Sequence, residues 1–305
     1  MNTHPSGEQF EIAAGDQRAT IVEVGGGIRE YEVASRPVLD PYPVDAMSDG
    51  AHGAPLTPWP NRLADGRYSF DGESHQVALT EPEKHNAIHG FLRWRPWTAV
   101  EHRAELVVMA TRLFPLQGYP FMLDLRVAYE LGDDGLTVET TVENVGDAAC
   151  PYGHGQHPYL SPGEGRLIDE CELQIAATSR VVTDPDRQLP TGTESVPGTP
   201  FDFDEPRVLG DFKIDDAFTG LRRDAAGRAW ARLSGPDGRS AELWVDESYP
   251  FIELYTGDTL SPGRARRGLG TEPMTCPPNA FASGEDVIRL EPGDCLTTTW
   301  GARLS

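Results

Sequence analysis

The chain has 305 residues, 38% of them hydrophobic and 24% charged, a composition typical of a globular protein with a sizeable core rather than of a disordered segment. Its formal net charge of −22 at pH 7 repels phosphate groups and anionic lipids, so nucleic acids and membranes are disfavoured as partners. The same acidity suits a neutral substrate better than an anionic one, although a local cluster of arginines can override the overall field.

The first residues and the cysteines both indicate a cytoplasmic protein. The start of the chain has neither the basic region nor the apolar region of a secretory leader, and no apolar run is long enough to span a bilayer. The four cysteines, Cys150, Cys171, Cys276 and Cys295, form no CxxC pair, so neither a zinc ribbon nor a redox motif is indicated. We therefore expect a soluble cytoplasmic protein with reduced thiols.

Apolar and polar residues alternate with a period of two in short segments along the chain, which predicts β-strands with one buried face. The first two expected strands, 19–24 and 30–33, flank Gly25-Gly26-Gly27, which we interpret as a tight turn because no nucleotide-binding motif continues from it. The clearest pattern is a hairpin, in which strands 121–131 and 136–142 enclose a Gly-Asp-Asp-Gly turn. The remaining expected strands are 105–110, 241–246, 251–256, 288–290 and 296–300.

No segment of a dozen residues has the 3.6-residue spacing of a helix, and 32 glycines and 26 prolines interrupt the chain throughout. Strands separated by turns without intervening helices predict an all-β fold, a large antiparallel β-sandwich. Segment 183–206 is rich in Pro, Asp and Thr and is predicted to be a long surface loop rather than a domain boundary. We therefore expect a single domain over residues 1–305.

Polar side chains of the kinds used in catalysis gather in five short segments. Taken singly, each has a structural interpretation: Asn61 and Arg62 could satisfy loop carbonyls, His89 could be a hydrogen-bonded core histidine, and Asp215 could cap a turn. The segments are 58–62, with Asn61 and Arg62; 86–91, with His89; 152–159, with His154 and His157; 214–218, with Asp215 and Asp216; and 271–281, with Glu272.

Metal and nucleophile motifs are missing from these segments. His154 and His157 lie three residues apart, but this helical spacing has little meaning in a β context, and neither an HExxH motif nor a partner cysteine accompanies them. We therefore expect no metal. A serine nucleophile is also poorly supported, because the sequence has no GxSxG elbow.

Taken together and in this order, the five segments resemble the aldose 1-epimerase (galactose mutarotase) family. The likeness spans nearly the whole chain and is carried by the following matches. The Asn-Arg region of the family resembles Pro58-Trp59-Pro60-Asn61-Arg62, followed by Asp65-Gly66-Arg67-Tyr68. Its first histidine motif resembles Asn86-Ala87-Ile88-His89-Gly90, and its second resembles Gln156-His157-Pro158-Tyr159-Leu160. Its Asp-x-x-Phe substrate contact resembles Asp215-Asp216-Ala217-Phe218, and the segment with its catalytic glutamate resembles Glu272-Pro273-Met274-Thr275-Cys276-Pro277-Pro278-Asn279-Ala280-Phe281.

The resemblance implies a β-sandwich with an open cleft on one sheet and an enzyme that interconverts the α and β anomers of a free aldose such as glucose or galactose, without a cofactor. It implies that Glu272 is the general base and His157 the general acid. It also implies that Asn61, Arg62, His89 and Asp215 bind the monosaccharide. The sequence departs from the family where many members have a second glycine after the first histidine. Here Gly90 is followed by Phe91-Leu92-Arg93-Trp94-Arg95, which bears on the role of this loop and on the substrate.

A carboxylate and a histidine suit anomerisation, because the reaction needs one group to take a proton from the C1 hydroxyl and another to protonate the ring oxygen. Both side chains exchange protons near neutral pH once their surroundings shift the pKa. Ring closure uses the same two groups in reversed roles. Neither electrons nor a chemical group is transferred, so no nicotinamide, flavin or metal is required.

Three other functions remain open from the sequence. A hexose-6-phosphate 1-epimerase would have the same chemistry, with Arg62, Arg93 and Arg95 as a phosphate clamp. A non-catalytic carbohydrate-binding sandwich would stack Trp59, Trp94 and Trp97 on sugar rings, but a pure binder has no need of an acid and a base. A glycosidase is a more distant possibility, since it requires two facing carboxylates.

Overall fold

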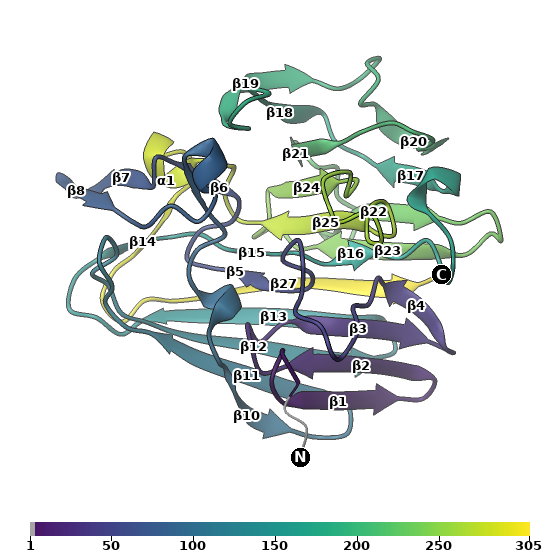
Figure 1. Cartoon of the computed structure of the whole chain (residues 1–305), viewed down its shortest axis with the longest axis horizontal. Helices are drawn as coiled ribbons and strands as arrows, with labels where there is room; N and C mark the ends of the chain where they lie inside the picture. Colours follow the sequence, from purple (N-terminus) through teal and green to yellow (C-terminus); the bar gives the residue numbers. More distant parts are fainter. Residues whose placement is uncertain (1–3) are drawn as a thin grey trace.

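Two large antiparallel sheets, which pack face to face, form most of the protein in the computed structural model (Figure 1), which describes residues 4–305. The predicted all-β sandwich is therefore confirmed. The expectation that the chain starts without a leader concerns, in part, residues 1–3, which lie outside the described residues. Among residues 4–305, no helix has the length and the apolar character needed to cross a membrane.

The first sheet carries most of the side chains discussed below. It joins the β1–β4 meander at the start of the chain to strands from the middle and the last part of the chain (Figure 1). In spatial order they are β1 (Gln9–Ala14), β2 (Gln17–Val22), β3 (Ile28–Val33), β4 (Arg36–Leu39), β16 (Tyr159–Leu160), β25 (Leu269–Met274), β24 (Phe251–Tyr255), β21 (Asp215–Thr219), β18 (Ser179–Thr183) and β19 (Pro190–Ser195); β15 (Gly155–Gln156) pairs with β25 and with β5 (Pro55–Leu56).

The second sheet contains the long predicted hairpin. It runs in the order β10 (Thr98–His102), β11 (Leu106–Leu113), β12 (Leu123–Gly132), β13 (Gly135–Asn144), β27 (Cys295–Leu304), β23 (Ser240–Val245), β22 (Ala229–Ser234), β17 (Glu172–Ile175) and β20 (Phe203–Val208). Three small ribbons complete the fold: β6 (Arg62–Ala64) with β9 (Asn86–Ile88), β7 (Arg67–Phe70) with β8 (Glu73–Gln76), and β14 (Cys150–Tyr152) with β26 (Ile288–Leu290). Helical structure is limited to α1 (Ala280–Ser283) and three 3₁₀ turns, η1 (Pro82–Lys84), η2 (Leu92–Trp94) and η3 (Ile168–Glu170).

Alternating side chains of the two sheets form the core between them. In β12 every second residue is buried, as the period-two pattern predicts for a strand with one solvated face. One apolar cluster contains residues of both sheets, among them Ile21 of β2 and Val127 of β12. Burial of this surface is the main stabilising contribution to the fold, at about 25 cal/mol per Å² of apolar area.

A buried chain of hydrogen bonds joins the sheets beneath β15. The amide of Gln156 donates to the Tyr129 hydroxyl at 3.0 Å and accepts from the indole of Trp300 at 3.2 Å. The Tyr129 hydroxyl donates in turn to the Gly26 carbonyl at 2.7 Å. Since Tyr129 and Trp300 belong to the second sheet, their bonds to Gln156 fix the position of β15 in the first sheet, and with it the residue that follows, His157.

The expected surface loop over 183–206 is wrong, because this segment contains β19 and the start of β20. β19 is an edge strand, and five of its six side chains are exposed. A strand with neither face buried has no apolar alternation, so the pattern that reveals the other strands is missing here. The other expected strands are present, with ends shifted by a few residues.

His154, which has no partner cysteine or HExxH motif, is a buried core histidine. Its side chain is 2% exposed, and its Nε2 atom lies 2.7 Å from Thr298 Oγ1 and 3.0 Å from Tyr249 Oη. Burial lowers the pKa of His154 to about 3. The folded protein therefore keeps this ring neutral at pH values where the unfolded chain protonates it.

This difference predicts a loss of stability in acid. Because the pKa of His154 is lower in the folded state, its contribution to stability is complete above about pH 6.5 and is lost as the pH falls toward 3, by about 1.4 kcal/mol for each pH unit. Urea denaturation of the His154→Gln variant between pH 7 and pH 4.5 is expected to show a shallower decline than the wild type. His85→Gln, at an exposed histidine, is the control. Equal slopes for wild type and His154→Gln would contradict the prediction.

Candidate functional site

The small β6–β9 ribbon carries three of the predicted site residues at one end. Arg62 pairs with Ile88 in this ribbon, so the next residues outward, Asn61 and His89, face each other at the end of the ribbon. The Asn61 backbone N–H donates to His89 Nδ1 at 3.1 Å, and the His89 N–H donates to the Asn61 carbonyl at 2.9 Å. These two bonds fix the imidazole ring and leave its Nε2 atom for other contacts.

His157 lies in the short link between β15 and β16. Its backbone is held on both sides, since its N–H donates to the Ala54 carbonyl at 3.1 Å and its carbonyl accepts from the Gly53 N–H at 2.9 Å. The ring stacks on Tyr159, with centroids 4.9 Å apart and planes 12° from parallel. It meets the ring of His89 edge-on at 5.4 Å.

Three carboxyl groups project from the same face of three adjacent strands. Glu272 of β25 is directly opposite Glu253 of β24, and Asp215 of β21 is opposite Tyr255 of β24. Opposite residues of an antiparallel pair point to the same face, and so do residues two apart in one strand. The strand register therefore gathers Asp215, Glu253 and Glu272, although they are far apart in the sequence.

Glu272 and His157 form a buried pair. The His157 Nε2 atom lies 3.0 Å from Glu272 Oε1, and the two residues are 3% and 5% exposed. Each has a second polar atom, Glu272 Oε2 and His157 Nδ1, with no hydrogen-bond partner among residues 4–305. Buried polar atoms without partners are unusual and often mark catalytic groups. The pair can hold and pass a proton.

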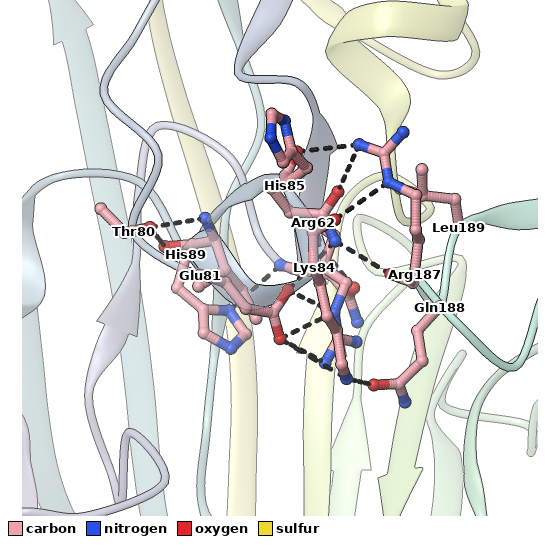
Figure 2. A network of polar contacts seen from close by, with 12 residues as sticks. Arg62, Thr80, Glu81, Lys84, His85, His89, Arg187, Gln188 and Leu189 are labelled. Atoms are coloured by element: carbon pink, nitrogen blue, oxygen red, sulfur yellow. Dashed lines mark hydrogen bonds and ion pairs between the residues drawn. The ribbon is translucent and has the colours of Figure 1, made fainter.

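Arg62 is held by Glu81 in a polar network beside this pair (Figure 2). The Arg62 Nε and Nη2 atoms each donate to the Glu81 carboxylate at 3.0 Å, and the Asn86 amide donates to the same group at 3.1 Å. Burial opposes the charge of Arg62, but Glu81 outweighs it and the pKa of Arg62 is raised. The guanidinium therefore keeps its charge and has a fixed orientation.

A second branch of the network reaches Asp215. Lys84 lies 3.7 Å from Glu81 and donates a hydrogen bond to Gln188, which in turn donates to Asp215 (Figure 2 shows Lys84 and Gln188). Asp215 is thereby connected to the residues around Arg62 through side chains alone. The neighbouring carboxyl group, Asp216, lies apart from this network and pairs with Arg180 at 2.5 Å.

These side chains surround a cleft of about 180 Å³. Pockets for drug-sized ligands measure ~300–1,000 Å³, so this volume suits a small polar molecule. A larger hollow of about 380 Å³ lies elsewhere, near Arg29 and Glu164, but it lacks a buried acid–base pair. The cleft brings together all six predicted site residues, and is lined by Gly50, Ala51, Asn61, Arg62, Ile88, His89, Arg93, His157, Tyr159, Asp215, Tyr255, Thr259, Leu260 and Glu272.

Sequence reasoning missed Glu253 and Glu81. Glu253 is 2% exposed and stands in the otherwise apolar strand Phe251–Tyr255, so a lone acid in a buried run was the available signal. Burial, and then the charges of Asp215 and Glu272, raise the pKa of Glu253 well above its usual range. Its neutral form is therefore favoured over a wider pH range than in a solvated glutamate, and in that form it can donate a hydrogen bond as well as accept one.

His89 is neutral for a related reason. Burial, and then the nearby charges of His157, Arg93 and Arg62, lower the pKa of His89 well below its usual range. Because its Nδ1 atom accepts a hydrogen bond from Asn61, the neutral ring carries its proton on Nε2. His89 is thus a hydrogen-bond donor at the cleft.

The structure also brings together three possible metal ligands that the sequence spacing did not reveal. Donor atoms of His89, His157 and Glu272 lie within 4.8 Å of one another. However, the Nε2 atom of neutral His89 carries a proton, and a metal ligand needs a free lone pair. The chemistry of the donor set therefore fits hydrogen bonding to a ligand better than a resident metal.

Two features considered from the sequence do not belong to the cleft. Trp59 and Trp97, each 2% exposed, are core residues, so the expected stacking of these rings on a sugar is wrong. Trp94 is 49% exposed but does not line the cleft. Arg95 is also exposed and away from the cleft, so the three-arginine clamp does not form as expected; only Arg62 and Arg93 lie there.

Comparison with known proteins gives one consistent family. The family model for aldose 1-epimerase matches residues 8–301. The chain is 36% identical to the uncharacterized protein YihR of Escherichia coli over 96% of this chain and 92% of that protein. It is 30% identical to the aldose 1-epimerase of Escherichia coli, over 72% of this chain and 66% of that enzyme.

Solved structures share the fold at lower identity. A putative aldose 1-epimerase from Escherichia coli superposes with a TM-score of 0.83 at 23% identity, covering 98% of this chain and 99% of that one. A galactose mutarotase-like protein from Clostridium acetobutylicum gives a TM-score of 0.84 at 19% identity, covering 97% and 94%. At these identities the likeness concerns the fold alone.

The raised pKa of Glu253 predicts a stability that falls with rising pH. The folded protein holds a proton on Glu253 that the unfolded chain releases above about pH 4.5. The contribution of Glu253 to the free energy of unfolding is therefore fully present below that pH. It is lost as the pH rises toward the folded-state pKa, by at most about 1.4 kcal/mol per pH unit. Relative to wild type, Glu253→Gln is expected to gain stability between pH 5 and pH 8 in urea denaturation. A difference that stays constant with pH would show that Glu253 is ionised in the folded protein.

Proposed function

The chain belongs to the aldose 1-epimerase family, and on that basis we propose that it interconverts the α and β anomers of an aldose with a free C1 hydroxyl. The observation that carries the proposal is the buried contact of 3.0 Å between His157 Nε2 and Glu272 Oε1 beside a small polar cleft. A carboxylate and an imidazole in contact are the minimum set for moving one proton onto a sugar ring and another off it.

Ring opening is the first half of the reaction. Glu272, as the carboxylate, takes the proton of the C1 hydroxyl, and the electron pair left on that oxygen forms the carbonyl of the aldehyde. The bond between C1 and the ring oxygen breaks, and its electron pair takes a proton from His157, which starts as the imidazolium. Glu272 ends protonated and His157 neutral.

Ring closure reverses these transfers after rotation about the C1–C2 bond. His157 removes the proton from the C5 hydroxyl oxygen as that oxygen attacks the other face of the aldehyde, and protonated Glu272 returns its proton to the oxygen on C1. Both residues regain their starting states. The cycle balances without an electron acceptor, a metal or a transferred group, so we propose that the enzyme needs no cofactor.

Four side chains would hold the sugar during these steps. Arg62 and Asp215 offer charged partners to ring hydroxyls, and each is already oriented, by Glu81 and Gln188 respectively. Neutral His89 offers an Nε2–H donor, and Asn61 lies beside it. Such preorganisation lowers the barrier, because the hydroxyls need not wait for the side chains to find them.

Two further parts of the proposal concern the chain as a whole. One apolar core is shared by both sheets, which supports a single domain over residues 1–305. All four cysteines are free and three are buried, as expected of a protein that works in a reducing compartment, and we infer a cytoplasmic location.

The acid–base pair is tested by removing each member. Glu272→Gln keeps the shape of the base but cannot accept the proton, and His157→Asn deletes the acid. Each is expected to lower kcat for anomerisation by on the order of 10²–10⁴, measured by polarimetry on freshly dissolved α-glucose and on a small panel of other aldoses. Glu247→Gln and His85→Gln, both on the surface, are controls that keep full activity. Near-wild-type kcat in folded Glu272→Gln would remove the base from the mechanism.

The double variant gives a second readout of the same pair. Since the two groups act together on one ring, the loss in the double variant is expected to be far smaller than the product of the two single losses. Sugar binding, measured by calorimetry, is expected to persist in all three variants. A double variant that loses the full product of both factors would mean that Glu272 and His157 act in independent steps.

The cofactor-free mechanism is tested by removing metal ions. Because neutral His89 carries its proton on the nitrogen that would have to bind a metal, anomerisation is expected to survive dialysis against a chelator unchanged. A loss of activity that only a divalent ion restores would overturn this part of the proposal.

A further inference from the structure

Arg93 brings an unpaired positive charge to the cleft. It lines the cleft together with His157 and Glu272, and it has no hydrogen bond or ion pair to its side chain among residues 4–305. Its guanidinium carbon lies 5.1 Å from the centre of the Trp94 ring, a cation–π contact that leaves the nitrogen atoms free to donate hydrogen bonds. Partial burial lowers the pKa of Arg93, which shows that its charge is held at a cost.

The other two cations beside the cleft are already neutralised by protein groups. Arg62 binds the Glu81 carboxylate with two of its nitrogens, and Lys84 lies between Glu81 and Gln188. Glu81 is saturated by these contacts and by the Asn86 amide, so it does not take Arg93 as a further partner. Within the described residues, Arg93 is thus the cation of the cleft whose charge is left for a ligand.

The backbone holds Arg93 firmly in this position. The segment 91–97 is anchored at both ends, since the Phe91 N–H donates to the Thr57 backbone carbonyl at 2.8 Å and the Trp97 N–H donates to the Glu23 backbone carbonyl at 2.8 Å. Gly25 packs directly against it: a Cβ atom at Gly25 would lie 2.7 Å from the Arg93 carbonyl oxygen. The Gly25-Gly26-Gly27 turn is therefore a close-packed support for the loop that carries Arg93.

We propose that the substrate is an aldose with an anionic group on its exocyclic carbon, C6 of a hexose, and that Arg93 binds this group. The inference rests on the proposed function and names the substrate class of the same cleft. It also gives a role to the segment Phe91-Leu92-Arg93-Trp94-Arg95, where the sequence departs from the glycine pair of the family it resembles.

The chemistry of the reaction selects C6 as the position of the anionic group. In a pyranose ring the exocyclic carbon is attached to C5, which is bonded to the ring oxygen that His157 protonates. Arg93 lines the same cleft as His157 and Glu272. C6 is the one carbon of a hexopyranose that lies outside the ring, so it can carry an anionic group while C1 keeps its free hydroxyl and the ring hydroxyls remain available to the other side chains of the cleft.

This substrate class reverses the preference that composition alone suggested. The net charge of −22 favours a neutral sugar, but charges on the surface are screened over about 8 Å at physiological ionic strength. A partly buried guanidinium in contact with the ligand is screened much less. The shared chemistry is an anionic oxygen group, which a phosphate ester, a sulfonate or a carboxylate can supply.

The test compares kcat/KM for glucose with that for its C6 phosphate, C6 sulfonate and C6 carboxylate derivatives, using anomer exchange followed by NMR. The kcat/KM for at least one anionic sugar is expected to exceed that for glucose by about 10- to 100-fold, the usual range for a charge-assisted hydrogen bond. The advantage is expected to shrink as salt increases. The three derivatives distinguish which anion the cleft accepts.

Variants then assign the preference to Arg93. Arg93→Gln is expected to bring the ratio of anionic to neutral kcat/KM down by at least tenfold, Arg93→Lys to retain part of it, and Arg95→Gln, at the exposed neighbour, to leave it unchanged. The proposal is overturned if the wild type prefers no C6 anion, a result that does not depend on any variant being stable. It is also overturned if the ratio of anionic to neutral kcat/KM is unchanged in Arg93→Gln. Equal turnover of glucose and all three anions would leave the epimerase function standing, whereas no anomerisation of any sugar would remove that function itself.

Discussion

A cluster of carboxyl groups on one sheet face is the constraint to which the rest of the site responds. Asp215, Glu253 and Glu272 project from neighbouring strands into a region where ionised groups are poorly solvated, and three adjacent negative charges there would be strongly unfavourable. Two features reduce this repulsion: the pKa of Glu253 is raised, which favours its neutral form, and Glu272 contacts His157. The same contact with His157 makes Glu272 suitable for proton transfer.

The sandwich core supplies the accuracy that this pair needs. A shift of one residue between β24 and β25 would turn Glu272 to the opposite face of the sheet, so the register is essential to the site. On the other side, His157 follows Gln156, whose amide is fixed by Tyr129 and Trp300 of the second sheet. Packing between the sheets therefore determines a distance of 3.0 Å between two side chains that no local sequence pattern connects. Elements of regular structure hold such geometry better than loops do.

How much the sequence predicted depends on which physical signal each feature leaves. Strands with one buried face, such as β12 and β13, were predicted because alternation is a direct consequence of the pleat. The exposed edge strand β19 was missed because nothing imposes alternation on it. Short motifs identified the six residues that the structure brings to the cleft, but their convergence was not visible, since it arises from pairing between distant strands. The pairing of Arg62 with Glu81 depends on that convergence, and no local pattern marked it, whereas Glu253 left only the weak signal of a lone acid in an apolar strand.

Chemistry and substrate charge are carried by different parts of the molecule. Glu272 belongs to β25 and His157 to the two-residue link between β15 and β16 of the same sheet, whereas Arg93 belongs to the 3₁₀ turn η2 in the loop after β9. Loops tolerate change that a packed sheet does not, because few buried contacts depend on their side chains. A different side chain at position 93 would alter the charge offered to the substrate and leave the register of Glu272 and the stacking of His157 as they are. Overall charge is then a poor guide to the ligand. The 48 acidic residues of the chain act on solubility and on distant encounters, while groups that line the cleft, Arg93 among them, act on the ligand at short range.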